Sequence, residues 1–308
     1  MREIAPVSVL VPTYNEEIHL TDCLASVAGW ASEIFVVDSF STDRTGEIAA
    51  RFGANFVQHR FEGYALQKNW ALENLDFKNE FVLIVDADER VTPELRDEIT
   101  AILVDTGNAS AGYYLNRRFI FYGKWIRHCG WHPSWNLRLF RHRLGRYEIR
   151  EVDEHVLLNG PAQYCKHDLL HEDVRGIKAW IEKHNRYSTY NSWIYSQIIQ
   201  GKSTGEVTPR LLGNLAERKR FIKQHIWPHL PGRAFLFFLY MYFLRLGFLD
   251  GLHGFHFCVM HAIFQQFVVV KQWEQKHYKQ QRPAEMAIAA GQASESRDHP
   301  GNWDCYGN

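Results

Sequence analysis

The sequence predicts an α/β fold in which a doubly wound, mostly parallel sheet carries helices on both faces and precedes a helical C-terminal region. Over about the first hundred residues, short β-branched runs alternate with segments of helical periodicity, as repeated βαβ units require. From Ala234 onward, long apolar runs replace this alternation. We therefore expect an α/β domain over residues 1–170, a helical region over residues 171–280 and a flexible polar tail over residues 281–308.

Four short apolar runs in the first domain are interpreted as strands. They are Val7–Val11, Ile34–Val37, Asn55–Gln58 and Phe81–Val85. The second run ends at Asp38 and the fourth at Asp86. Ligands of doubly wound sheets bind beyond the carboxyl ends of the strands, so both aspartates lie where a site is expected.

Helical patterns separate these strands. Asn15 is predicted to cap a helix whose inner face carries Leu20, Leu24 and Val27. A second helix is expected over Thr45–Phe52.

The next helical pattern covers Tyr64–Leu75, with Leu66, Trp70 and Leu75 facing inward. Thr92 followed by Pro93 indicates another helix start, because a capping hydroxyl precedes a proline in the first helical position.

The pattern changes after Gly112. A strand is expected over Tyr113–Tyr122, followed by an irregular, basic and aromatic stretch. Helices are expected over Glu172–Ser196 and Thr208–Trp227. His171, Glu172 and Asp173 are interpreted as residues at a helix start, where acidic side chains suit the helix dipole.

Composition narrows the possible functions. The 35 basic and 35 acidic residues balance, which argues against a general nucleic-acid binder. The five cysteines form no CxxC pair, so no zinc or redox motif is indicated and a reducing compartment fits. The N-terminus shows no signal-peptide pattern, so we expect the α/β domain in the cytoplasm. The ten tryptophans fit a rich core and sugar or lipid contacts equally well.

Two aspartates one residue apart, Asp86 and Asp88, follow the most apolar strand. Hard cations such as Mg²⁺ and Mn²⁺ prefer carboxylate oxygens together with phosphates and water. The pair is therefore a candidate metal site for a nucleotide diphosphate, although a solvated turn would show the same residues. Asp38 is either a turn former or a hydrogen-bond partner for a nucleotide base or ribose.

Three linked motifs, SVLVPTYNEE, VVDSFSTDRT and VLIVDADE, resemble the inverting family 2 glycosyltransferases. Four further segments, GYALQKNWAL, WNLRLFRH, EVDEHVLLNG and GFLDG, resemble the branch that includes the lipopolysaccharide core β-1,4-glucosyltransferases. The resemblance covers roughly residues 5–275 and weakens beyond 170. It implies a GT-A fold, a UDP-sugar donor and metal-dependent hexosyl transfer.

By position, the resemblance gives several residues a role at the nucleotide. Pro12, Tyr14 and Glu16 would border it, and Asp38 would contact the uracil or ribose.

The resemblance also assigns residues to the metal and the phosphates. Asp88 would be the direct metal ligand, and Asp86 would contact the ribose or the metal. Lys68 and Asn69 would lie near the donor, whereas without the resemblance Lys68 is better explained as a lysine on the surface of a helix.

Inverting transfer needs a base that takes the proton of the acceptor hydroxyl. The branch has His-Glu where this chain has Asp153-Glu154, so Glu154 is our first candidate for this base and Asp153 the second. A simple acidic loop that includes Glu151 is the alternative.

A basic and aromatic segment precedes that loop. Arg138 and Arg141 are candidates for gripping the donor diphosphate or an acidic acceptor, and Trp135 for stacking on an acceptor sugar. Alternatively, Leu137, Leu139 and Phe140 belong to a core strand whose arginines form the exposed face.

Two apolar runs, Ala234–Leu249 and Phe255–Val270, mark the C-terminal region. Neither reaches the roughly eighteen uninterrupted apolar residues of a spanning helix, so a pair of interfacial or re-entrant helices is predicted. Between Thr208 and Arg245 there are seven basic residues and one acid, which suits anionic headgroups. We expect a peripheral or monotopic protein on the cytoplasmic face of the inner membrane, with a dimer interface or a cap on the core as alternatives.

These features together predict an inverting, metal-dependent glycosyltransferase that transfers sugar, with UDP-glucose favoured as donor, to a lipid-linked or cell-envelope saccharide. One alternative is a transferase that loads sugar onto polyprenyl phosphate. Another is a nucleotide-sugar-binding scaffold without turnover.

Overall fold

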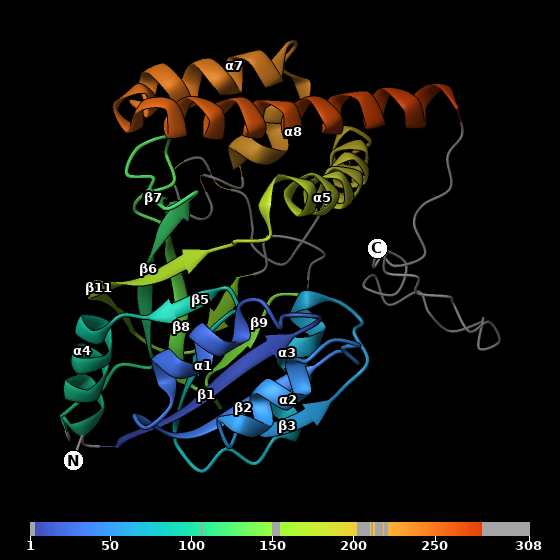
Figure 1. Ribbon diagram of the computed structural model, residues 1–308. Coiled ribbons are helices and arrows are strands. Elements are labelled where there is room, and N and C mark those ends of the chain that lie inside the picture. The colour runs from blue at the N-terminus through green and yellow to red at the C-terminus, as the bar shows by residue number, and fades with distance from the viewer. Residues whose placement is uncertain are drawn as a thin grey trace.

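The computed structural model describes residues 4–105, 107–149, 155–201, 210, 212, 218 and 221–278. The α/β domain forms the lower part of the molecule in Figure 1. Helices α7 and α8 lie across the top, above α5. The predicted fold class is confirmed: helices cover both faces of a central sheet, and a helical region follows it. The predicted polar tail lies outside the described residues.

The first half of the sheet is parallel. Strands β1 (Ala5–Thr13), β2 (Ala31–Asp38), β3 (Asn55–Gln58) and β4 (Phe81–Ile84) pair in the order β3-β2-β1-β4. All four predicted strands are therefore confirmed. Their carboxyl ends meet at one edge, since Thr13 pairs with Asp38 and β4 runs alongside β1.

Helices fill both faces of this half because the strand residues alternate between them. Helices α1 (Leu20–Val27), α2 (Thr45–Arg51) and α4 (Pro93–Val104) pack on one face. Helix α3 (Tyr64–Asn74) packs on the other. The capping prediction for α4 is confirmed, since Thr92 Oγ1 accepts a hydrogen bond from the amide of Leu95.

Two predictions about these helices are wrong in detail. Asn15 does not cap α1, whose N-cap is His19. The side chain of Asn15 instead accepts a hydrogen bond from the amide of Thr42, which ties the loop after β1 to the loop after β2. In α3 the fully buried side is not the predicted one: Gln67 and Lys68 are buried, and Trp70 is only half-buried.

The second half of the sheet is mixed. It adds β8 (Trp135–Arg141), β6 (Gly112–Phe121), β11 (Ala162–Glu172) and the short β5 (Glu89–Val91) in the order β4-β8-β6-β11-β5. The short β7 (Lys124–Trp125) pairs with β6. Strand β8 is antiparallel to both neighbours, whereas β11 is parallel to β6. A separate hairpin pairs β9 (Gly145–Tyr147) with β10 (Val156–Leu158).

Strand β11 corrects one sequence interpretation. His171 and Glu172 are its last residues rather than the start of a helix, and α5 begins only at Gly176. The strand is extended this far because it pairs with β6 on one side and with β5 on the other. As a result, the amide of Glu172 donates to the carbonyl of Asp88 at 3.0 Å.

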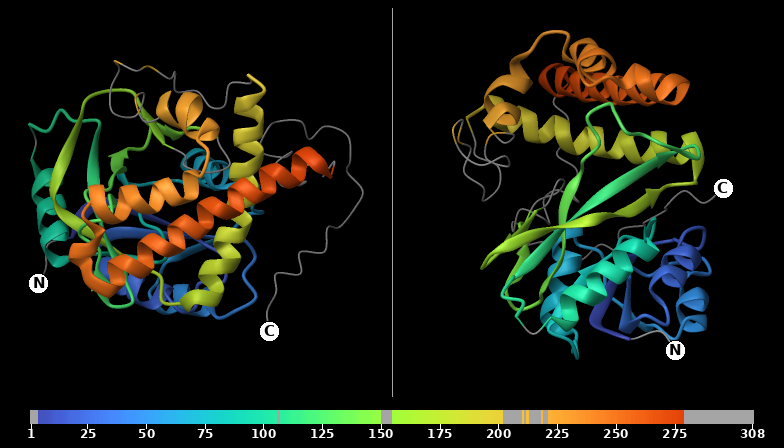
Figure 2. Two further views of the ribbon diagram at one scale, coloured as in Figure 1. Left: turned by 90° about the horizontal axis from the view of Figure 1, so that it is seen from above. Right: turned by 90° about the vertical axis from the view of Figure 1, so that its left-hand side faces the viewer.

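Among its described residues, the helical region contains α5 (Gly176–Ile199), α7 (Arg233–Leu239) and α8 (Gly251–His277). Two short π-helical segments are Ile222–Ile226 and Tyr240–Leu244, and two 3₁₀ turns are Trp227–His229 and Gly247–Asp250. Helix α8 packs on α5 and crosses it, as the left view in Figure 2 shows. Most of the helix predicted over Thr208–Trp227 lies outside the described residues.

The predicted length of the last apolar segment is wrong. Within the described residues, Gly247–His277 forms one helical stretch that is long and apolar enough to cross a membrane. Two of the polar residues that interrupt the predicted apolar run face the protein: His261 packs on Trp131, and Gln265 accepts from the indole N–H of Trp227. The other two, His256 and Gln266, are exposed. A third of its most apolar window is buried, at 33%.

Asp250 joins this helix to the α/β domain. Its carboxylate accepts hydrogen bonds from the amides of Arg127 and His128, and its carbonyl accepts from Lys124 Nζ at 2.8 Å. The GFLDG segment is thus anchored to the turn after β7.

Candidate functional site

The carboxyl ends of β1, β2 and β4 bring the predicted residues together at one edge of the sheet. Asp38, at the end of β2, is completely buried. Its carboxylate accepts hydrogen bonds from Thr13 Oγ1 at 3.1 Å, the Ser41 amide at 2.8 Å and Gln58 Nε2 at 3.2 Å. These contacts hold the loop that follows β2 against the end of β1.

Asp86 lies within a cluster of buried charges. Arg138 Nη2 donates to Asp86 Oδ2 at 2.5 Å and to Glu89 Oε1 at 3.0 Å. The other Glu89 oxygen accepts from the amide of Asp86 at 2.9 Å. Partial burial would raise the pKa of Asp86, but Arg138 and Lys68 hold this pKa well below its usual range. Asp86 therefore remains an anion whose position Arg138 and Glu89 fix.

Arg138 is 5% exposed, so the alternative in which it forms the exposed face of a strand is wrong. A β-bulge explains why. Tyr113 pairs with Leu139 and Tyr114 with Leu137, so Arg138 is an extra residue in β8. Bulges redirect side chains near functional sites, and this one directs Arg138 toward the carboxylates that follow β4.

Lys68 is also buried, at 7% exposure, so its interpretation as a surface lysine is wrong. Its Nζ lies 3.9 Å from Asp86 Oδ1 and 4.8 Å from the centre of the Tyr147 ring. The neighbouring Asn69 exchanges two hydrogen bonds with the backbone of Tyr147. Helix α3 thus supplies a cation to the site and anchors β9.

Asp88 faces a residue that the sequence analysis missed. His171 Nδ1 lies 3.3 Å from Asp88 Oδ1, yet this buried nitrogen has no hydrogen bond of acceptable geometry. Burial opposes ionisation of Asp88, but His171 and Lys183 keep its pKa well below its usual range. The end of β11 brings His171 to Asp88, whereas the sequence pattern indicates only a helix start.

Asp88 and His171 fit a divalent cation. A carboxylate oxygen and an imidazole nitrogen are both ligands for first-row divalent metals, and the nitrogen lacks another partner. Within the described part of the chain, no group of three or more His, Cys, Asp or Glu side chains has the geometry of a metal site. A metal here would therefore need further ligands from substrate and water.

The residues predicted at the nucleotide differ in accessibility. Tyr14 is 39% exposed and Pro12 is half-buried. Glu16 points inward: its carboxylate lies 2.8 Å from His19 Nδ1 and 3.3 Å from Arg175 Nη1.

His19 connects the loop after β1 to the segment after β11. Its Nε2 lies 3.5 Å from Asp173 Oδ1 and 3.1 Å from the amide of Val174. The protonated ring donates to the carboxylate, whereas only the neutral ring can accept from the amide. Although burial lowers it, the Asp173 and Glu16 carboxylates raise the pKa of His19 to about 9.

This shift predicts a pH-dependent contribution to stability. The folded pKa of about 9 exceeds the ordinary value of 6.5, so the contribution is fully present below pH 6.5 and is lost as pH rises through 9. We expect His19→Gln to reduce the free energy of unfolding by about 3 kcal/mol at pH 6 and by much less at pH 10. Urea denaturation at both pH values measures this, with exposed His229→Gln as control; a deficit that does not change with pH would contradict the prediction.

The two candidate bases, Glu154 and Asp153, lie outside the described residues, as does Glu151. The flanking strands β9 and β10 pair with each other, and Val156 and Leu158 pack against the core that contains α3.

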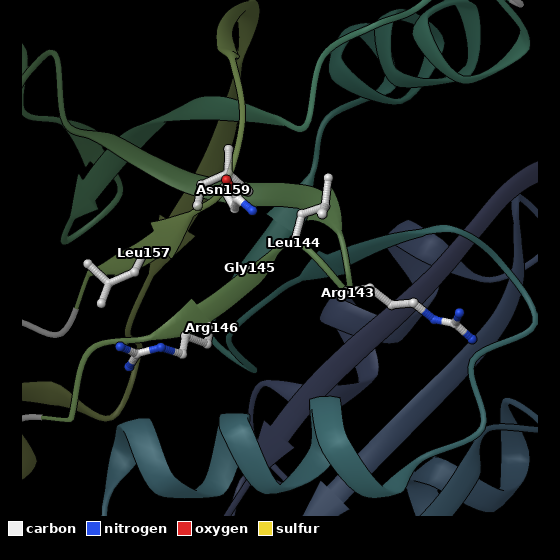
Figure 3. Close-up of a pocket in the computed structure, with 7 residues that line it drawn as sticks. Arg143, Leu144, Gly145, Arg146, Leu157 and Asn159 are labelled. Atoms are coloured by element: carbon white, nitrogen blue, oxygen red, sulfur yellow. The ribbon is translucent and has the colours of Figure 1, made fainter.

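A hollow lies beside the β9–β10 hairpin. Figure 3 shows this hollow, of about 400 Å³, which is lined by Arg143, Leu144, Gly145, Arg146, Leu157, Leu158 and Asn159. The side chains of Arg143 and Arg146 point in opposite directions, so they do not converge on an anion. Neither Asp86 nor Asp88 lines this hollow, and we assign it no role.

The sequence of the α/β domain is similar to a known family. Residues 8–154 match the model of Glycosyl transferase family 2. This part of the chain resembles a glycosyltransferase family 2 domain.

Similar proteins agree with this resemblance. An uncharacterized glycosyltransferase of Rickettsia bellii is 42% identical over 96 residues, 31% of this chain and 32% of that protein. The poly(ribitol-phosphate) β-N-acetylglucosaminyltransferase TarS of Staphylococcus aureus is 34% identical over 107 residues, 31% of this chain and 18% of that protein. The match thus spans about a third or less of the length of these relatives.

Among solved structures, the mannosyltransferase PcManGT of Pyrobaculum calidifontis, in complex with GDP-Man and Mn²⁺, is similar at a TM-score of 0.49 and 17% identity. The likeness covers 89% of each chain. A likeness at this level says nothing about the donor or acceptor of this chain.

Proposed function

We propose that this protein is an inverting, metal-dependent glycosyltransferase that moves a hexose from a nucleotide-sugar donor to a lipid-linked or cell-envelope saccharide. The observation that carries the proposal is the arrangement after β4: Asp86 is held by Arg138 and Glu89, while Asp88 faces His171. Asp86, Asp88, Glu89 and Arg138 lie within residues 8–154, which match the family 2 model, and His171 lies beyond them. The resemblance to the lipopolysaccharide core branch favours UDP-glucose as donor.

Each residue has a chemical role in this proposal. Asp88 and His171 would hold Mg²⁺ or Mn²⁺, which neutralises charge on the leaving diphosphate. Lys68, buried 3.9 Å from Asp86, supplies a fixed positive charge on the same side. Arg138 positions Asp86 rather than binding a phosphate, because its guanidinium is occupied by the carboxylates of Asp86 and Glu89.

The acceptor hydroxyl must lose its proton as it attacks the anomeric carbon. We assign this proton to Glu154, with Asp153 as the alternative, a step that contributes roughly 10² to 10⁴ in rate. The hydroxyl oxygen forms the new glycosidic bond while the bond to the diphosphate breaks, and the proton remains on the carboxylate.

The decisive experiment measures nucleotide release. Purified protein with Mn²⁺ or Mg²⁺ is incubated with a panel of nucleotide sugars and a membrane lipid extract as acceptor source. We expect release from one donor that requires metal and is lost in Glu154→Gln but not in Glu151→Gln. Metal-dependent donor binding without turnover would favour a binding scaffold, and transfer onto polyprenyl phosphate alone would favour the lipid-loading alternative.

We also propose that the helical region contacts the membrane surface. Five apolar side chains between the start of α7 and the start of α8 are more than half exposed: Phe235, Phe243, Leu244, Leu249 and Leu252. Seven basic residues lie between Thr208 and Arg245 in sequence. One of them, Arg233, is buried, and the other six suit anionic headgroups.

A charged residue on this surface should weaken membrane binding. Leu244 is 76% exposed and Leu252 is 74% exposed, so aspartate at either position creates no buried charge. We expect the double change Leu244→Asp/Leu252→Asp to reduce co-sedimentation with anionic vesicles at least about tenfold. Val104→Asp, on α4 and 49% exposed, is the control; equal sedimentation of all three proteins would contradict membrane contact.

A further inference from the structure

We propose that Trp135, Tyr114 and Tyr164 form a binding platform for the saccharide acceptor on the open face of β6, β8 and β11. This proposal rests on the proposed function, because it specifies where the acceptor of that reaction binds. The three residues come from three adjacent strands.

The bulge at Arg138 places Trp135 on this face. Beyond the bulge, Trp135 pairs with Asn116, and residues paired across antiparallel strands share a face. Leu115 and Leu169 belong to the core beneath α4, so their chain neighbours Asn116 and Asp168 face the opposite side. One extra residue in β8 therefore directs Arg138 toward Asp86 and sets Trp135 on the face away from α4.

The three rings form a continuous surface that solvent reaches. Tyr114 stacks on Tyr164 with ring centres 4.9 Å apart, and Trp135 meets Tyr164 edge-on at 4.9 Å. Trp135 is 38% exposed and Tyr164 is 60% exposed. Apolar rings ordered by one another and left open to water suit the apolar face of a pyranose.

Polar side chains continue the platform along the same face. Asn116 Nδ2 donates to Asp168 Oδ1 at 2.6 Å, and Arg118 donates to Asp168 Oδ2. Asn116 is buried at 4% exposure and holds Asp168 in place, whereas the Arg118 side chain is 37% exposed and its guanidinium can donate to sugar hydroxyls. Rings next to such a group indicate a saccharide rather than a purely apolar ligand.

The platform lies at a suitable distance from the reacting centre. Trp135 precedes Arg138 by three residues of one strand, about 10 Å along it, and Arg138 contacts Asp86 directly. The distance accommodates a sugar unit adjacent to the one whose hydroxyl attacks. The structure thus assigns the platform to an acceptor of more than one sugar unit.

The test separates acceptor binding from chemistry. Oligosaccharides are released from the membrane lipid extract by mild acid, and their binding to wild type, Trp135→Ala and Tyr164→Ala is measured by saturation-transfer NMR and calorimetry. We expect each variant to bind about tenfold more weakly, a change typical of one lost ring contact. Phe56→Ala, on β3 at the far edge and 37% exposed, is the matched control, and Trp135→Phe should retain most of the binding.

The kinetic arm uses the nucleotide-release assay with the intact extract. The KM for the acceptor should rise about tenfold in Trp135→Ala, while the KM for the donor and the slow hydrolysis of donor by water stay unchanged. Unchanged oligosaccharide binding in both variants would overturn the platform, even if wild-type transfer is intact. Weaker vesicle binding with unchanged oligosaccharide binding would assign these rings to the lipid surface instead. A protein that binds the oligosaccharides through these rings but turns over no donor would refute the proposed reaction and leave the platform standing.

Discussion

Asp88→Asn should lower nucleotide-sugar turnover by at least about a thousandfold while leaving the protein folded. Removing one charge-stabilising group in an active site typically costs about 10² to 10³ in rate, and here the change also removes a proposed metal ligand. Asp88 is held as an anion beside His171, whose buried Nδ1 has no hydrogen-bond partner. The amide is nearly the same size, so packing is retained while the negative charge is lost.

The measurement pairs turnover with metal binding. Mn²⁺ affinity, followed by water-proton relaxation or calorimetry, should fall in both Asp88→Asn and His171→Ala. Asp22→Asn is the control, because its side chain is 64% exposed and lies on α1, outside this cluster. Full turnover by Asp88→Asn, or unchanged Mn²⁺ affinity in both variants, would contradict a metal held by this pair.

Much of the first half of the fold can be predicted from local patterns. The strands that end at Asp38 and Asp86 are short apolar runs bounded by polar residues, and their parallel pairing follows from the helices between them. The placement of both aspartates at one edge then follows from topology alone. Prediction succeeds here because the hydrophobic pattern and the chain connectivity indicate the same structure.

The residues that complete the site could not be predicted in the same way. Lys68 is buried beside Tyr147 and Asp86, which lie on other elements of the chain. The direction of Arg138 depends on a bulge that appears only in the pairing of β8 with β6. His171 reaches Asp88 because β5 pairs with the end of β11. Each of these depends on the register between strands, which local periodicity does not determine.

The length of the C-terminal helix could not be predicted for a different reason. Its polar residues limit the predicted apolar run to Phe255–Val270, because hydropathy counts each polar residue against the run. In the structure, His261 is buried against Trp131, and Gln272 accepts a hydrogen bond from Arg233. These polar groups are satisfied inside the protein, so the helix continues through them.

Arg138→Met should produce the largest loss of stability among single changes in the charge cluster. Arg138 lies between Glu89, which is fully buried, and Asp86. Removing one partner of a buried ion pair typically costs about 3–5 kcal/mol, because the remaining charge is left uncompensated. Arg117 Nη1 is 3.7 Å from Glu89 and Lys68 Nζ is 3.9 Å from Asp86, so we expect the lower part of that range, about 3 kcal/mol.

Urea denaturation of a double-mutant cycle tests the explanation. Glu89→Gln removes the buried carboxylate that Arg138→Met leaves unpaired, so the double variant should be more stable than the sum of the two single losses predicts, by about 1–3 kcal/mol. Arg44→Met is the control: its side chain is 65% exposed and pairs with the exposed Glu47, so its loss should stay within about 1 kcal/mol. Strictly additive losses would show that Arg138 stabilises the site by packing rather than by balancing these carboxylates. In that case Asp86 would be positioned by the backbone after β4, and Arg138→Met would leave the dependence of turnover on metal concentration unchanged.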